Sequence, residues 1–129
     1  MANAFSFALD LRKFADSIPE ELVKPVVQKF AMHALSSVVM KSPVDTGRFR
    51  GNWNVAVNAV DYSVSEVTDK SGGSTIAKGV ATIEAAAPEQ AIFISNNVPY
   101  AVALENGHSK QAPAGVVALT FAELESMTL

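Results

Sequence analysis

A long run of apolar residues at helical spacing limits the folds open to this chain more than any other pattern in its sequence. The run consists of Leu22, Val23, Val26, Val27, Phe30, Ala34 and Val38. Apolar residues at such steps form one stripe along a helix. An S-x-x-E capping box at Ser17–Glu20, with a proline in the first turn, predicts that this helix starts there and ends near Lys41. Pro25 either kinks the helix or moves its start to Lys24, because proline removes a backbone donor and crowds the preceding turn.

The hydrophobic period changes to two beyond the turn cluster Ser42–Gly47, where proline stops the helix and glycine permits positive φ. The apolar members of the new pattern are Trp53, Val55, Val57 and Ala59. They alternate with polar or small residues from Asn52 onward, which predicts a strand with one buried face. A weaker alternation over Tyr62–Thr68 indicates a hairpin partner for this strand.

Two shorter segments also have helical spacing. The first contains Phe7, Leu11, Phe14 and Ile18, and it predicts a short helix over Ser6–Ser17. The second predicts a helix from Ile76 to Ala87, with Ser74 or Thr75 as its cap and Pro88 just past its end. Gly79 is the weak point of that helix, because glycine has a low helix propensity.

The remaining segments are shorter. Ala91–Ser95 is rich in β-formers and too short for a helix, so it predicts a buried strand. Tyr100–Glu105 predicts one or two helical turns that Asn106 and Gly107 close. The last apolar series favours a helix over Val117–Leu124, with a strand over Gly115–Phe121 as the alternative.

Together these elements predict an α+β fold, in which a small, mostly antiparallel sheet packs with a long N-terminal helix and shorter helices. A chain of 129 residues is of single-domain size, so we expect one domain over residues 1–129. The composition, 49% hydrophobic and 18% charged, excludes disordered, collagen-like and coiled-coil chains.

Charge and cysteine content exclude several function classes. A net charge of -3 disfavours nucleic-acid binding as the main role, because such binding needs a basic surface. The absence of cysteine removes disulfides, thiolate nucleophiles and cysteine-based metal sites, and it fits a chain folded in a reducing cytoplasm. Neither a signal peptide nor a membrane helix is expected, so the sequence predicts a soluble protein without a membrane partner.

Few residues suggest catalysis. His108 lies three residues from Glu105, and an imidazole beside a carboxylate can serve as a general base, so a small hydrolase remains an alternative. No nucleophile elbow or metal-ligand spacing accompanies the pair, and we expect no catalytic, cofactor or metal site. His33, midway along the long helix, is expected to be a helix-boundary side chain and not a metal ligand, because neither Lys29 nor Ser37 one turn away could share a metal with it. Trp53 is expected in the core and not on a base-stacking surface.

Two segments combine turn residues, an aromatic residue and charge in a way that simple packing explains poorly. They are Ser42–Trp53, which contains P-V-D-T-G-R-F-R-G-N-W, and Ile94–Val116, I-S-N-N-V-P-Y-A-V-A-L-E-N-G-H-S-K-Q-A-P-A-G-V. We expect each to form a rigid corner through bonds from side chains to the backbone. The candidate bonding residues are Asp45 and Thr46 in the first segment and Asn96 or Asn97 in the second.

With a long helix before them and a strand between them, these two segments resemble the tail-completion or neck proteins of tailed bacteriophages, also described as minor tail components. The resemblance spans about residues 20–120. It rests on Asp45, Thr46, Gly47, Arg48, Trp53, Asn96, Asn97, Pro99, Tyr100, Glu105, Gly107, Ser109, Gln111, Ala112, Pro113 and Gly115. It implies a structural protein of the head-to-tail connector, a six-fold ring subunit with a fold similar to that of tail-terminator proteins. No catalytic residue and no cofactor come with it.

On this basis we expect a virion protein, made in the host cytoplasm, that joins the tail tube to the head through ring assembly. A tail terminator, which caps tube polymerisation, is the alternative. The expected partners are copies of the chain, tail-tube or terminator subunits and head-connector proteins, while DNA passes through the ring without specific binding. A ring needs two different complementary surfaces on each subunit. One candidate surface contains Tyr100, Glu105, His108, Lys110, Gln111 and Pro113. The other is Asp69–Ser74, a flexible loop tip by composition that could become ordered on contact.

Overall fold

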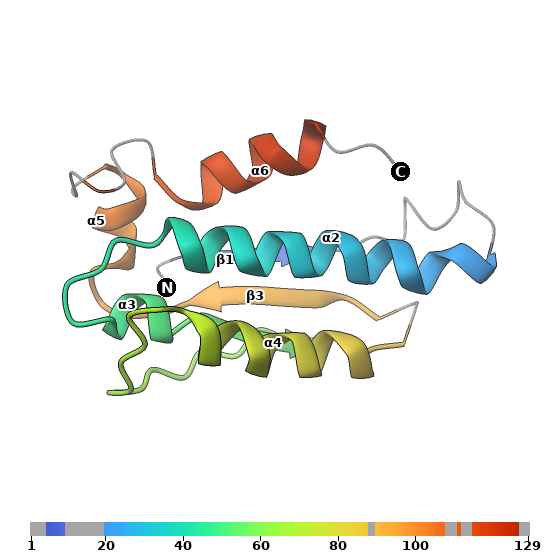
Figure 1. The fold of residues 1–129 in the computed structure, drawn as a ribbon, viewed down its shortest axis with the longest axis horizontal. Helices are drawn as coiled ribbons and strands as arrows, with labels where there is room; N and C mark the ends of the chain where they lie inside the picture. The colour runs from blue at the N-terminus through green and yellow to red at the C-terminus, as the bar shows by residue number, and fades with distance from the viewer. Residues whose placement is uncertain (1–4, 10–19, 88–89, 108–110, 112–114, 127–129) are drawn as a thin grey trace.

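The computed structural model describes residues 5–9, 20–87, 90–107, 111 and 115–126, and it is an α+β fold as predicted (Figure 1). The elements in chain order are β1 (Phe5–Leu9), α2 (Glu20–Lys41), α3 (Arg48–Gly51), β2 (Asn54–Val57), α4 (Gly73–Ala85), β3 (Ile92–Asn96), α5 (Ala101–Glu105) and α6 (Val117–Ser126). No helix in these ranges is long and apolar enough to cross a membrane.

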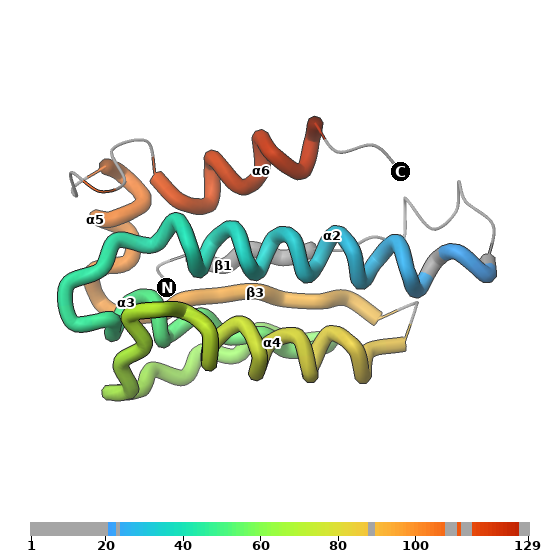
Figure 2. The backbone as a smooth tube through the Cα atoms, in the orientation of Figure 1, coloured from blue at the N-terminus to red at the C-terminus, as the bar shows by residue number. Residues whose placement is uncertain are grey.

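The sheet is antiparallel, with β3 between β1 and β2. Ile94 faces Phe7 of β1 on one side and Val55 of β2 on the other. Figure 2 shows α2 and α4 side by side over one face of this sheet, with α6 running along the other flank of α2. The short helices α3 and α5 lie together at the end of the molecule where α2 terminates.

The core lies between α2, α4 and the sheet. Its fully buried large side chains include Leu35, Val38, Val39, Ile83, Ile92, Ile94, Val98 and Val116. Gly79 of α4 sits where this layer is thinnest, because a Cβ atom there would come within 2.3 Å of Leu35 Cδ2 and 2.9 Å of Val55 Cγ2. The residue that weakens α4 locally therefore permits the close approach of α4 to α2 and β2.

The long helix is continuous over Glu20–Lys41 and includes Pro25 in its second turn. Proline lacks the donor that would reach the carbonyl group of Glu21, so the missing bond falls at the very start of the helix. The other residues of the predicted capping box lie outside the described residues. Lys41 ends the helix as predicted, and the turn cluster follows it.

Two predictions at the ends of the chain meet different outcomes. The predicted helix over residues 6–17 is wrong for residues 6–9, which belong to β1, and its remainder lies outside the described residues. Phe5, Phe7 and Leu9 also stand at alternate positions, and pairing with the free edge of β3 satisfies the backbone there. At the other end, Val117–Ser126 is helical, so the alternative of a strand is wrong.

The middle of the chain departs further from the prediction. β2 is shorter than the predicted strand, and the sequence did not indicate the single turn of α3 before it. The predicted strand over residues 62–68 is wrong, since these residues form no backbone ladder. The predicted caps of α4, Ser74 or Thr75, are also wrong. Asp69 caps the helix, because its carboxylate accepts the N–H groups of Gly72 at 3.0 Å and Thr75 at 2.8 Å.

Candidate functional site

The two turn-rich segments that begin at Ser42 and Ile94 meet at one open cleft of about 500 Å³ beside α3 and α5. The first segment contributes residues 43–49 to its walls. The second contributes Tyr100, Leu104 and Gln111. These groups lie more than 50 positions apart in the sequence, and the ends of α2 and β3 bring them together.

Hydrogen bonds to the backbone fix the loop on one side of the cleft. The Gln111 side-chain amide accepts the Val44 N–H at 2.9 Å and donates to the Val44 carbonyl oxygen at 3.0 Å. Thr46 Oγ1 accepts the N–H of Arg48 at 3.2 Å, a bond of the kind predicted for this residue. Asp45 is exposed, and its predicted bond to a nearby N–H is not among the hydrogen bonds of the described residues.

Gly47 closes this loop in a conformation that favours glycine. Its φ is +91°, and a Cβ atom would lie 2.7 Å from the backbone nitrogen of Lys70. Its carbonyl oxygen accepts the N–H groups of Gly51 and Asp69, both at 2.9 Å. The glycine of the D-T-G triplet thus joins the cleft loop to α3 and to the segment before α4.

Aromatic side chains support the cleft from below. Phe49 lines it, with its ring centroid 5.7 Å from that of Trp53 and 6.3 Å from that of Tyr100. Trp53 is buried, as predicted, and its Nε1 donates to Ser42 Oγ at 2.7 Å. Ser42 in turn donates to the Val38 carbonyl oxygen at 2.6 Å, which ties the cleft to the end of α2.

The asparagine pair at the end of β3 forms the predicted rigid corner. Asn96 is fully buried, and it donates to the Phe49 carbonyl oxygen at 2.8 Å and accepts the Val98 N–H at 3.3 Å. Asn97 donates to the Asp61 carbonyl oxygen at 3.1 Å. Pro99 follows as an exposed turn residue. The corner therefore sets the position of Phe49 and with it the floor of the cleft.

Glu105 has a role that the sequence did not predict. Its carboxylate accepts the N–H groups of Val116 and Val117 at 2.8 Å and of Ala118 at 3.0 Å, so it caps the start of α6 from a distance. Both carboxylate oxygens are thus engaged by the backbone of α6, and the assignment of Glu105 to a subunit interface stays a prediction. His108, Lys110 and Pro113 lie outside the described residues.

Side-chain amides and guanidinium groups hold the extended segment 61–69 against α3 and β2. Asn52 donates to the Ser65 carbonyl oxygen at 3.0 Å and accepts its N–H at 2.7 Å. Asn54 donates to the Ser63 carbonyl oxygen at 3.0 Å. Arg50 donates to the carbonyl oxygens of Lys70, Met40 and Ser42. The loop at residues 69–74, predicted to be flexible, is anchored by the bond from Arg50 to Lys70 and by the Asp69 carboxylate.

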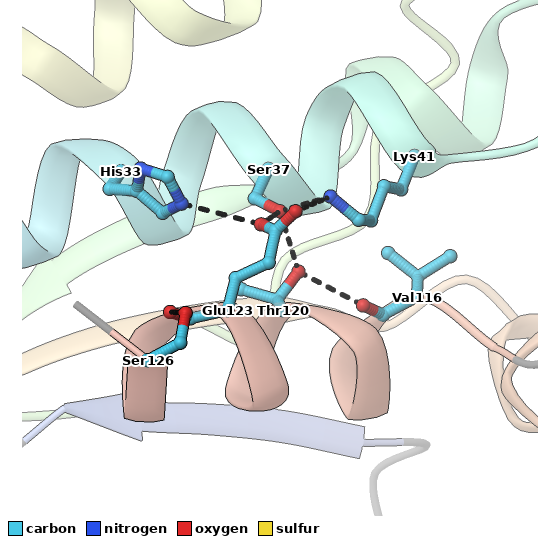
Figure 3. A network of polar contacts seen from close by, with 7 residues as sticks. All are labelled: His33, Ser37, Lys41, Val116, Thr120, Glu123 and Ser126. Atoms are coloured by element: carbon cyan, nitrogen blue, oxygen red, sulfur yellow. Dashed lines mark hydrogen bonds and ion pairs between the residues drawn. The ribbon is translucent and has the colours of Figure 1, made fainter.

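A second polar cluster, which the sequence did not indicate, joins α2 to α6 (Figure 3). Glu123 accepts Ser37 Oγ at 2.6 Å and pairs with Lys41 Nζ at 2.7 Å. His33 Nε2, midway along α2, lies 3.3 Å from the same carboxylate. His33, Ser37 and Lys41 are spaced four residues apart, so they lie in one line on α2. This spacing was the feature of the sequence that could have indicated the cluster.

The electrostatics of this cluster favour a structural role. The hydrogen bond from Lys41, followed by that from Ser37, lowers the pKa of Glu123 to about 2. Lys41 Nζ also donates to Ser37 Oγ at 2.7 Å, so the lysine bridges the hydroxyl group and the carboxylate and joins the two helices. The described residues contain no group of three or more side chains that could hold a metal ion.

No family model matches this chain, and no curated protein or solved structure matches it.

Proposed function

We propose that this chain is a virion structural protein of the head-to-tail connector, a tail-completion protein that acts by ring assembly and not by catalysis. The observation that carries the proposal is the cleft in which the two segments resembling neck proteins meet. Both segments resemble parts of neck proteins, and they lie on one surface although they are far apart in the sequence. A single partner could therefore contact both.

The chemistry of the cleft favours a protein surface as that partner. Its loop is fixed by bonds from Gln111 and Thr46, so little ordering is needed when a partner binds. Tyr100 presents a partly exposed ring at its edge, and aromatic side chains are enriched in the contact regions of protein interfaces. We assign Tyr100 and Gln111 to the subunit interface, together with His108, Lys110 and Pro113 from the same segment.

A ring around DNA needs a channel that does not retain it. The net charge of -3 suits that role, because a modestly acidic wall repels the phosphate backbone. The proposed neighbours are copies of this chain, tail-tube or terminator subunits and head-connector proteins, in the neck of the virion. A tail terminator is the second candidate within the same class, since its ring would use the same kind of interface.

The alternative of a small hydrolase is weakened by Glu105. A general-base pair would need this carboxylate to orient His108, but its oxygens accept three backbone N–H groups of α6. A hydrolase would also need a positioned nucleophile. Ser37 donates its proton to Glu123, a carboxylate that is a weak base because its pKa is lowered to about 2, and it accepts a hydrogen bond from Lys41, so neither partner activates the hydroxyl group.

The test combines assembly with function. The mass of the purified chain is measured over a concentration series, and the chain is then mixed with purified phage tails that lack it. We expect a ring, or a monomer that becomes fixed in stoichiometric amount at the head-proximal end of the tail. A chain that stays monomeric and binds neither tails nor heads would refute the proposal.

A matched pair of variants locates the interface. Tyr100→Ala removes a ring that is 40% exposed at the cleft, and Leu119→Ala removes a side chain that is 41% exposed on α6. We expect the first variant to lose assembly at least about tenfold, the scale of a truncated interface residue, and the second to assemble normally. Equal assembly of the two variants would show that the cleft is not the subunit interface.

A further inference from the structure

Residues 62–68 form an exposed strip with an unusual share of apolar side chains. All seven residues are exposed. Tyr62 and Val67 are each 59% accessible and Val64 is 43% accessible, so three of the large exposed hydrophobic side chains of the described residues fall in one short run. Such a run on a protein surface is typical of an interaction site.

The strip is an extended chain held along one side only. Ser65 lies opposite Asn52, and Ser63 lies opposite Asn54. The strip therefore runs antiparallel to residues 52–54. Side-chain amides make these contacts in place of a backbone ladder. The body of the molecule therefore engages the carbonyl oxygen of Ser63 and both backbone groups of Ser65, while the N–H groups of Ser63 and Val67 bond to the nearby side chains of Asp61 and Ser65.

The even-numbered residues offer a free edge. Among the described residues, the N–H and C=O groups of Tyr62, Val64 and Glu66 have no hydrogen-bond partner. In an extended chain these groups point to the side opposite those of Ser63 and Ser65. Unpaired donors and acceptors in such a row form a template for another strand.

We propose that this edge pairs antiparallel with the same strip of a second copy of the chain, with Val64 facing Val64 of the partner subunit at the centre. This contact goes beyond the proposed function, since it lies outside the cleft. In this register Tyr62 faces Glu66 of the partner subunit, so the residues with free backbone groups occupy the hydrogen-bonded positions of the pair and the serines occupy the non-hydrogen-bonded positions. Each facing pair of this type exchanges two hydrogen bonds.

The sequence of the strip is self-complementary about Val64, which favours a second copy over a foreign strand. Ser63 faces Ser65 of the partner subunit, and Asp61 faces Val67 of the partner subunit. No two like charges stand opposite each other, although like charges directly opposite destabilise a strand pair. Arg48 lies 3.5 Å from the Glu66 carboxylate, so its positive charge reduces the repulsion between Glu66 and acidic groups of the partner subunit.

Single-cysteine trapping tests this contact in the full chain. One strand pair buries less than the roughly 1,200 Å² of stable complexes, so the dimer is expected to be weak and is best measured covalently. The chain contains no cysteine, and Val64→Cys therefore introduces a single thiol. Facing residues of this kind have Cα atoms about 5.5 Å apart, within the range that a disulfide spans.

The matched control is Leu119→Cys on α6, outside the cleft, where leucine is 41% accessible. Under mild oxidation we expect Val64→Cys to form disulfide-linked dimers at least about tenfold faster, because preassociation raises the effective thiol concentration. Equal rates for the two variants would overturn the proposal, as would dimers from Val64→Cys that form only when another virion protein is present.

A second measurement does not depend on disulfide geometry. Val64→Pro removes the central donor of the free edge and leaves the bonds of Ser63 and Ser65 in place, whereas Val67→Lys removes an exposed apolar side chain without blocking that donor. In a chain that also carries Tyr100→Ala, so that the cleft contact is removed, we expect Val64→Pro to abolish the remaining concentration-dependent rise in mass and Val67→Lys to retain it. Repeating the trapping with Tyr100→Ala also present separates this contact from the cleft: unchanged dimer formation supports the edge, and loss of it refutes an independent contact.

Discussion

The corner around the cleft and the seam between α2 and α6 are held by different kinds of polar contact. In the corner, neutral amides and arginines bond to backbone carbonyl and N–H groups, as Asn52 and Asn96 do. In the seam, Glu123 bonds to the side chains of Lys41 and Ser37. Bonds to the backbone fix the path of the chain, whereas bonds between side chains join helices whose paths are already set.

This difference has consequences for shape and for stability. Changes in the corner should alter the cleft as well as the free energy of unfolding, because its loops have no regular secondary structure of their own. Changes in the seam should alter mainly the docking of α6. The seam also depends on ionised groups, so it should respond to acid and salt, whereas amides do not titrate.

The largest effect is expected for Asn52→Ala in the corner. The buried amide makes three hydrogen bonds, one to the Arg48 carbonyl oxygen and two to the backbone of Ser65. Leaving these groups unpaired should lower the free energy of unfolding by about 3 kcal/mol. Urea denaturation measures the loss, with the more exposed Asn54→Ala as the milder control. A loss below about 1 kcal/mol would show that water replaces the amide easily.

The second-largest loss of stability is expected for Glu105→Ala, which removes the contact between the corner and α6. Its removal leaves the first N–H groups of α6 without their acceptor, which should lower the free energy of unfolding by about 2 kcal/mol. Amide hydrogen exchange at Val117 and Ala118 should accelerate, while exchange within α4 should not change. Equal acceleration in both helices would mean that Glu105 acts on the whole fold and not on α6.

A smaller effect is expected for Glu123→Gln in the seam. The Glu123 side chain is 41% accessible, so solvent screens its pairing with Lys41, and we expect a loss of about 0.5–1 kcal/mol at pH 7. The loss should shrink when salt is added, unlike the loss in Asn52→Ala. A salt-independent loss would show that the hydrogen bond from Ser37 dominates the contribution of Glu123.

The pH dependence of this variant sharpens the same contrast. The pKa of Glu123 is lowered from 4.5 to about 2 in the folded state, so the folded state favours the carboxylate. Its stabilisation is therefore present above pH 4.5 and is lost as the pH falls from 4.5 towards 2. We expect Glu123→Gln to lose stability less steeply than the unaltered chain over this interval. Asp61 and Asp69, whose pKa values are also lowered, by hydrogen bonds from Ser63 and Thr75, should retain part of the slope.

The smallest effect is expected for His33→Ala. Its contact with Glu123 is long, at 3.3 Å, and both side chains are about two-fifths exposed. We expect a change below about 0.5 kcal/mol in urea denaturation at pH 7. A larger loss would assign the imidazole a packing role on α2.

Local patterns predicted those elements whose residues are neighbours in the sequence. The apolar stripe of α2, the buried β-formers of β3 and the apolar series of α6 each fall in elements of the predicted type. Two turn glycines also follow local rules, since Gly47 and Gly107 both adopt positive φ. The corner was indicated by its dense turn chemistry, and the bonds of Thr46 and Asn96 confirm part of it.

Other features could not be predicted because they depend on partners distant in the sequence. Residues 62–68 alternate like a strand, but Asn52 and Asn54 meet them with side chains where a strand would use its backbone. Asp69 caps α4 from four residues before it, and Glu105 caps α6 from twelve residues before it. The hydrophobic period of a segment does not predict which distant side chain will hydrogen-bond to its backbone groups.

The sequence by itself determined the α+β class, the long helix, the central strand and the two turn-rich segments, because periodicity and turn chemistry act between close neighbours. Only the tertiary structure decided that these segments share a cleft, that Glu105 serves α6 and that His33, Ser37 and Lys41 converge on Glu123. Those contacts join residues from 11 to 90 positions apart. Their geometry exists only after the helices have packed, since a directional hydrogen bond requires both partners to be in place.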